Sequence, residues 1–188
     1  MIPDYYRENL WDKSILLSQY ENTEHLIDYA DKLDILLNKI KKDGRIYNAV
    51  AIVAPRGMSK MTWGYTVMQT LEEQKRPTVP LLDTFEVFKI LQNADKSGGN
   101  KYSDFITTPL LMVTTTKGEL HKYNFDCIDL LLDKRSRLGL DTIILSRYTL
   151  YEMASRDRRR LNNIQEDSTF KNPQRYLSII QYYPERML

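Results

Sequence analysis

Apolar residues recur in the first part of the chain at the spacing of one helix face. Five of them follow one another at alternating intervals of four and three residues: Leu26, Ala30, Leu33, Leu37 and Ile40. Asn22 or Thr23 can cap the start of this helix, and Asp43-Gly44 can end it. We expect the stripe to pack on the core of the protein, and docking to a partner as a coiled coil is the alternative. Residues 1–22 predict a short helix or an arm, which either docks a partner or packs on the same core.

Beyond this helix, short apolar runs alternate with amphipathic segments. The runs predict strands at residues 49–53, 78–82, 110–113, 142–145 and 176–183. The segments between them predict helices at 62–75, 84–94 and 125–138 and a last helix from Thr149, with a loop at 95–101. Strands that alternate with helices indicate an α/β fold with a mostly parallel sheet flanked by helices. We expect residues 1–45 to form an N-terminal helical arm and residues 46–188 a single domain.

Composition and charge narrow the function only slightly. The chain is 42% hydrophobic and 28% charged, which is typical of a globular protein and argues against disorder. Lys and Arg outnumber Asp and Glu by only 27 to 25, too small an excess to indicate a nucleic-acid-binding protein. Cys127 is the only cysteine, and His25 and His121 lack metal-ligand spacing, so we expect no metal site built from these residues. No apolar run approaches the roughly 20 residues of a membrane span, and no secretory signal is visible, so we expect a cytoplasmic protein.

The turn after the first predicted strand has the form of a P-loop. It runs Ala54-Pro55-Arg56-Gly57-Met58-Ser59-Lys60-Met61-Thr62 and leads directly into a predicted helix. In the pattern G-x-x-x-x-G-K-[ST], backbone amides surround phosphates, the lysine neutralises them and the hydroxyl holds magnesium. Lys60 stands at the expected place, but Ala54, Ser59 and Met61 replace the two glycines and the hydroxyl. The candidate nucleotide-binding residues are Arg56, Gly57, Met58, Ser59, Lys60, Met61 and Thr62, and an ordinary strand–turn–helix is the alternative.

From about Ile46 to Asn163, the order of segments resembles the AAA+ ATPase domain of bacterial and phage replicative-helicase loaders of the DnaC/DnaI type. Residues 80–86 resemble the second strand and the following helix of that family, and residues 110–116 occupy the place of its Walker B strand. Thr114 and Thr115 then stand where the family has two acidic residues, and Arg147 stands where its sensor strand has asparagine. Three arginines fall near the family's arginine finger or serve as DNA contacts: Arg158, Arg159 and Arg160. The resemblance implies that residues 46–188 form a P-loop NTPase core of AAA+ type.

The resemblance also implies a DNA-replication accessory protein, a P-loop assembly factor. Its implied partners are a replicative helicase, another helicase loader, further copies of itself and single-stranded DNA. Phosphoryl transfer requires carboxylates to order magnesium and to position water, and Thr114 and Thr115 are not carboxylates. We therefore expect no catalytic residue and negligible ATPase activity, as in a pseudoenzyme, while binding of ATP or ADP with magnesium stays open. An inactive loader paralogue that regulates a functional loader, and an atypical P-loop ATPase or kinase that uses Glu119, are the other functions considered.

Overall fold

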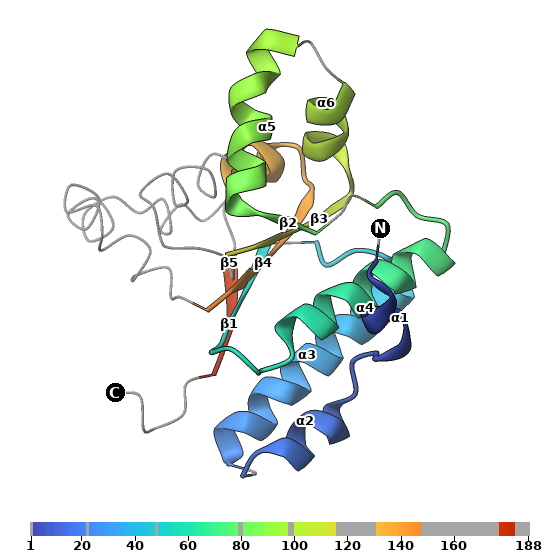
Figure 1. Cartoon of the computed structure of the whole chain (residues 1–188), viewed down its shortest axis with the longest axis vertical. Helices are drawn as coiled ribbons and strands as arrows, with labels where there is room; N and C mark the ends of the chain where they lie inside the picture. Colours follow the sequence, from blue (N-terminus) through green and yellow to red (C-terminus); the bar gives the residue numbers. More distant parts are fainter. Residues whose placement is uncertain are drawn as a thin grey trace, which may run out of the picture.

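The computed structural model describes residues 2–21, 23–47, 49–78, 81–97, 100–115, 131–147 and 177–182. Its centre is a five-stranded sheet with the strand order β2-β3-β4-β1-β5 (Figure 1). The strands are β1 (Ala49–Val53), β2 (Leu82–Asp83), β3 (Leu110–Thr114), β4 (Asp141–Ser146) and β5 (Leu177–Gln181). All neighbouring strands in this sheet pair in parallel. The predicted α/β class with a parallel sheet is therefore confirmed.

The inner strands of the sheet are buried on both faces, which explains their unbroken apolar runs. Side chains of a strand alternate between the two faces, and β3 shows this alternation clearly. Leu110 and Met112 belong to a large hydrophobic cluster on one face, whereas Leu111 and Val113 belong to a second cluster on the other face. Helices α1 to α4 gather over the first face, and α5 and α6 lie over the second (Figure 1).

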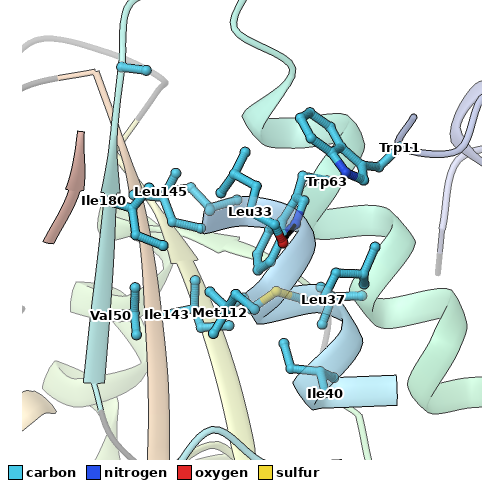
Figure 2. Packing of buried hydrophobic residues seen from close by; sticks show 14 of the residues in the cluster. Trp11, Leu33, Leu37, Ile40, Val50, Trp63, Met112, Ile143, Leu145 and Ile180 are labelled. Carbon is cyan, nitrogen blue, oxygen red and sulfur yellow. Dashed lines mark hydrogen bonds between the residues drawn. The ribbon is translucent and has the colours of Figure 1, made fainter. Parts of the chain in front are cut away.

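The N-terminal part of the chain forms three helices, α1 (Asp4–Glu8), α2 (Lys13–Gln19) and α3 (Glu24–Asp43). The predicted long helix is confirmed with both of its end signals. The Thr23 hydroxyl accepts a hydrogen bond from the amide of Leu26 at 3.2 Å, and Gly44 ends the helix with a φ of +64°. The stripe of α3 faces the sheet, where Leu33, Leu37 and Ile40 meet the β1, β3 and β4 side chains Val50, Met112 and Ile143 (Figure 2). The stripe therefore packs on the core.

Residues before α3 pack on the same core. Ile2, Trp11 and Leu16 are buried in the large cluster. The indole of Trp11 donates to Asp34 of α3 at 2.6 Å, and its backbone amide donates to the hydroxyl of Thr66 at 2.8 Å. The arm is therefore attached to both α3 and the helix after β1. Packing on the core is the alternative that the structure bears out for this segment, and the domain boundary at residue 45 stays a prediction.

The remaining helices are α4 (Lys60–Glu73), α5 (Thr84–Ser97) and α6 (Asn100–Thr107). A capping box stands at the start of α5: the Asp83 amide donates to the Glu86 carboxylate at 2.8 Å, and the Glu86 amide donates to the Asp83 carboxylate at 2.9 Å. The loop predicted at residues 95–101 is wrong, because α5 continues to Ser97 and α6 begins at Asn100. Phe105 and Ile106 are buried in the second cluster and form the apolar face of α6. The polar residues at the start of α6 are the reason that the sequence pattern predicted a loop there.

Two predicted helices fall partly or wholly outside the described residues. Residues 131–137 are helical, in agreement with the end of the helix predicted at 125–138. The first part of that helix and the helix predicted from Thr149 lie outside the described part of the chain. No helix among the described residues is long and apolar enough to cross a membrane.

Arg135 joins three segments below the second face of the sheet. Its side chain is completely buried and donates to the backbone carbonyls of Phe105, Ile106, Thr108 and Asp141 and to the Thr142 hydroxyl, at 2.5–3.3 Å. Burial lowers the pKa of this guanidinium to about 10. A buried cation needs such partners, so Arg135 connects α6 and the segment after it to the start of β4.

Candidate functional site

The candidate site begins with the backbone of the turn between β1 and α4. The amide of Ala54 donates to the carbonyl of Ser146 at 3.0 Å, which ties the start of the turn to the end of β4. Gly57 has a φ of +86°, and Ser59, directly before α4, has a φ of +51° and a ψ of 17°. Ser59 therefore adopts the left-handed conformation at the position where the P-loop pattern has its last glycine. Although serine replaces glycine at position 59, the backbone before α4 has the left-handed conformation that glycine normally adopts there.

Lys60, the first residue of α4, folds back over this turn. Its side chain is only 5% exposed, and its ammonium group donates to the carbonyls of Ala54 at 2.5 Å and Pro55 at 2.6 Å. Burial lowers the pKa of Lys60 to about 8. The positive charge is held by carbonyl dipoles, without an ion pair among the described residues. An anion in front of the turn would supply the counter-charge that a buried ammonium lacks.

A pocket of about 650 Å³ lies in front of the turn. All seven predicted nucleotide-binding residues, Arg56 to Thr62, line it on one side. Residues of α1, of α2 and of the segment between them line it on the other side, among them Tyr5, Leu10 and Ile15. The pocket therefore has a cationic end at the turn and a wall of aromatic and aliphatic side chains with two acidic residues, Glu8 and Asp12. Its volume is in the range that small organic ligands occupy.

The wall formed by the N-terminal segment is held against α4. The rings of Tyr6 and Tyr65 stack with their centroids 4.3 Å apart, and Arg7 pairs with Glu72 at 3.6 Å. Asp12, an acidic residue of the wall, uses its carboxylate to cap α2 through the amide and hydroxyl of Ser14. The Ser14 hydrogen bonds lower the pKa of Asp12. Its carboxylate therefore already has hydrogen-bond partners within its own helix.

The carboxyl ends of β3 and β4 lie beside the turn, as expected for neighbouring parallel strands. Thr114 and Thr115 are buried at the end of β3, and the Thr115 hydroxyl donates to the Ser146 hydroxyl at 2.6 Å. Arg147, the residue at the sensor position, follows Ser146 directly and is partly buried. The structure therefore brings Thr114, Thr115 and Arg147 to the same sheet edge as the turn, while their predicted Walker B and sensor roles stay predictions. Arg158, Arg159 and Arg160 lie outside the described residues.

These residues fit the phosphate part of a magnesium nucleotide, but the turn and the carboxyl end of β3 supply no carboxylate for its metal. The turn, the helix N-terminus and Lys60 suit an anion. Magnesium is usually bound through one or two carboxylates in addition to phosphates and water. The carboxylates that line this pocket, Glu8 and Asp12, belong to the N-terminal wall and not to the turn. In the described ranges, no three His, Cys, Asp or Glu side chains are grouped so that they could hold a metal ion.

Two site residues were not found from the sequence. The hydroxyl of Tyr20 donates to the carbonyl of Gly57, and the hydroxyl of Tyr29 donates to the carbonyl of Met58, both at 3.3 Å. Tyr29 lies three residues after Leu26 and four before Leu33, so the stripe itself places it on the buried face of α3. Its contact with the turn could not be predicted, because the two are 29 residues apart.

No family model and no curated protein matches this sequence. Solved structures match its fold. The crystal structure of the DnaC helicase loader has a TM-score of 0.58 at 15% identity, covering 95% of this chain and 99% of that chain. DnaI has a TM-score of 0.55 at 16% identity, covering 97% and 100%. The replication initiator DnaA bound to AMPPCP and single-stranded DNA has a TM-score of 0.54 at 12% identity, covering 89% of this chain and 50% of that chain.

The similarity to these structures establishes the fold. The chain has the α/β fold of the DnaC and DnaI helicase loaders and of DnaA. The fold implied by the sequence resemblance is thereby confirmed. What the chain binds and does is a separate question, because one fold serves many functions.

Proposed function

We propose that this protein is a DNA-replication accessory factor of the helicase-loader type, which binds a nucleotide and assists assembly with little or no ATP hydrolysis. The proposal is supported by a fold shared with the DnaC helicase loader over 95% of the chain, together with a turn after β1 that carries a buried lysine, where the sequence predicts a P-loop. The loader-type core accounts for nearly all of the residues, and the turn supplies the phosphate-binding part of the site.

The proposed ligand is ATP or ADP, with its phosphates at the turn. The amides of residues 57–61 and the ammonium of Lys60 would hold the phosphates, and Arg56 lines the same pocket. Bound nucleotide would supply negative charge to a lysine that is otherwise surrounded by carbonyl oxygens. A DnaA structure with the same fold was determined with AMPPCP bound, which is consistent with this placement.

The proposed lack of hydrolysis follows from the residues at the ends of β3 and α4. Loss of one well-placed catalytic group commonly lowers the rate about 10²–10⁴-fold. Here Thr114, Thr115 and Met61 together replace two carboxylates and a metal-binding hydroxyl. The threonines lack a group that accepts a proton near neutral pH, and the thioether is a poor ligand for magnesium. The nucleotide would therefore act as a bound effector rather than as a substrate.

The proposed partners are a replicative helicase, another helicase loader, further copies of this chain and single-stranded DNA. Arg158, Arg159 and Arg160 are proposed as an arginine finger toward a neighbouring subunit or as contacts to DNA phosphates. The experiment that tests the proposal is co-purification of the chain with a hexameric replicative helicase in the presence of ATP, ADP or no nucleotide. We expect association with the helicase that depends on nucleotide and is weakened in Lys60→Ala.

Other outcomes of this experiment are equally informative. Association with an intact loader, together with inhibition of that loader's ATPase, would favour the regulatory paralogue over the assembly factor. Absence of binding to helicase, loader and single-stranded DNA would refute the proposal. Release of phosphate by the pure protein that disappears in Lys60→Ala would contradict the proposed lack of hydrolysis.

The metal requirement gives an independent test by calorimetry. We expect the affinity for ADP to change less than about threefold between magnesium and EDTA, since the turn and the carboxyl end of β3 supply no carboxylate to the metal. The variant Met61→Thr with Thr114→Asp restores a hydroxyl and a carboxylate, and should make binding depend on magnesium. A wild-type affinity that rises tenfold or more with magnesium would show that another residue completes the metal site.

A further inference from the structure

Two tyrosines of the N-terminal helical region contact the P-loop turn from outside the pocket. Tyr29 of α3 is completely buried, and its hydroxyl donates to the carbonyl of Met58 at 3.3 Å. Tyr20, which follows α2, donates to the carbonyl of Gly57 at 3.3 Å. Neither tyrosine lines the pocket. Two successive carbonyls of the turn are therefore directed to groups that lie off the pocket surface.

The direction of these carbonyls determines the direction of the amides that follow them. In a planar trans peptide, the carbonyl of one residue and the amide of the next point in opposite directions. When the carbonyls of Gly57 and Met58 point to the tyrosines, the amides of Met58 and Ser59 point to the opposite side. Left-handed residues within such a turn allow successive amides to converge on an anion, and Gly57 and Ser59 are the left-handed residues here.

We propose that Tyr29 and Tyr20 are positioning residues of the phosphate site, which hold the turn in its anion-binding conformation before any ligand arrives. The inference rests on the proposed nucleotide-binding role of the turn. The positioning groups come from the helical region ahead of β1, so that region contributes to phosphate affinity as well as to the core.

A second contact of α3 makes this positioning rigid. The indole of Trp63 in α4 donates to the carbonyl of Leu33 at 3.1 Å. Leu33 lies one helical turn after Tyr29. Helix α3 therefore contacts the P-loop turn through Tyr29 and the following helix α4 through Leu33. Tyr29 and Trp63 are both fully buried, which leaves them little freedom to move. Burial also raises the pKa of Tyr29, so its hydroxyl stays protonated and remains a donor at neutral pH.

The experiment compares Tyr29→Phe and Tyr20→Phe with Tyr182→Phe as a matched control. Tyr182 is buried, and its ring lies 5.8 Å from that of Tyr29, so the control removes a hydroxyl from the same aromatic pair. The first measurement is hydrogen exchange of amides 57–62 in the ligand-free protein. The second is the affinity for inorganic pyrophosphate by calorimetry, which needs neither a base nor hydrolysis.

We expect Tyr29→Phe to raise the exchange rate of these amides and to weaken pyrophosphate binding, each by about three- to tenfold, as for the loss of one buried hydrogen bond. Tyr20 is 40% exposed, so Tyr20→Phe should weaken binding by only about twofold. Tyr182→Phe should change neither quantity at the turn. If Tyr29→Phe does not fold, Tyr20→Phe carries the test alone.

The two measurements separate the inference from the function on which it rests. If wild-type protein does not bind pyrophosphate, the proposed nucleotide binding fails, while amide exchange still decides whether the tyrosines hold the turn. If Tyr29→Phe and Tyr20→Phe match Tyr182→Phe in exchange, the inference is overturned. The inference is also overturned if Tyr29→Phe lowers the melting temperature but leaves the affinity of a binding-competent protein unchanged, because the role would then be structural only.

Discussion

Ser59 offers a quantitative test of the P-loop conformation. With a φ of +51° it occupies the left-handed region, which costs a residue with a Cβ roughly 1–2 kcal/mol. Ser59→Gly removes this strain but makes the unfolded chain more flexible, which costs about 0.4–1 kcal/mol. The Ser59 side chain makes no capping hydrogen bond to α4, so none is lost. We therefore expect Ser59→Gly to raise the free energy of unfolding by about 0.5–1 kcal/mol.

The assay is urea denaturation followed by circular dichroism, in which the midpoint rises and the slope stays constant. Gly139→Ala calibrates the strain, because Gly139 has a φ of +64° and an added Cβ would meet no atom within 4 Å. Gly139→Ala should lower the free energy of unfolding by nearly the amount that Ser59→Gly raises it. Lys75→Gly, at a φ of +57° beyond the far end of α4, is the matched control for a left-handed residue away from the pocket.

Stability and binding should separate these variants. Ser59→Gly and Lys75→Gly should stabilise the protein similarly, but only Ser59→Gly should tighten pyrophosphate binding, because it also removes a Cβ from the pocket wall. If Gly139→Ala destabilises the protein as expected and Ser59→Gly does not stabilise it, the left-handed conformation of Ser59, and with it the P-loop interpretation of the turn, is refuted.

Three further predictions concern other parts of the structure. Because burial lowers the pKa of Lys60 from 10.5 to about 8, the unfolded chain binds more protons between these values. Stability should therefore rise from pH 8 to 10.5 by no more than about 3 kcal/mol in denaturation curves, and Lys60→Met should remove this rise. Arg135→Lys should cost about 3–5 kcal/mol in the same assay, because one ammonium cannot reach all the carbonyls that the guanidinium serves, and a cost below 1 kcal/mol would contradict this role. Gly57→Ala places a Cβ 2.7 Å from the Tyr20 hydroxyl at a φ of +86°, so calorimetry should show weaker pyrophosphate binding than in wild type, and unchanged affinity would refute this reasoning.

Local sequence patterns were sufficient for most of the elements and for one half of the candidate site. The stripe of α3, the capping box at Asp83 and the apolar runs of β1, β3 and β4 each depend on residues close together in the chain. The same holds for Arg56 to Thr62, which reach one pocket because they belong to one turn. Phe105 shows the limit of local patterns. The polar residues before α6 gave no sign of an apolar face, and Phe105 is recognised as a core residue only from its burial in the second cluster.

Only the tertiary structure determined the surroundings of the turn between β1 and α4. The sequence determined that a strand ends, that a lysine follows and that a helix begins, since backbone preferences and periodicity act over a few residues. It did not determine that α1 and α2 form the facing wall of the pocket, or that Tyr20 and Tyr29 hold the carbonyls of Gly57 and Met58. In the Tyr29 contact the two residues are separated by 29 positions in the sequence, and in the Tyr20 contact by 37 positions. They exist because the hydrophobic core brings α3 against α4 and the sheet, and no local pattern encodes which distant side chains will then meet.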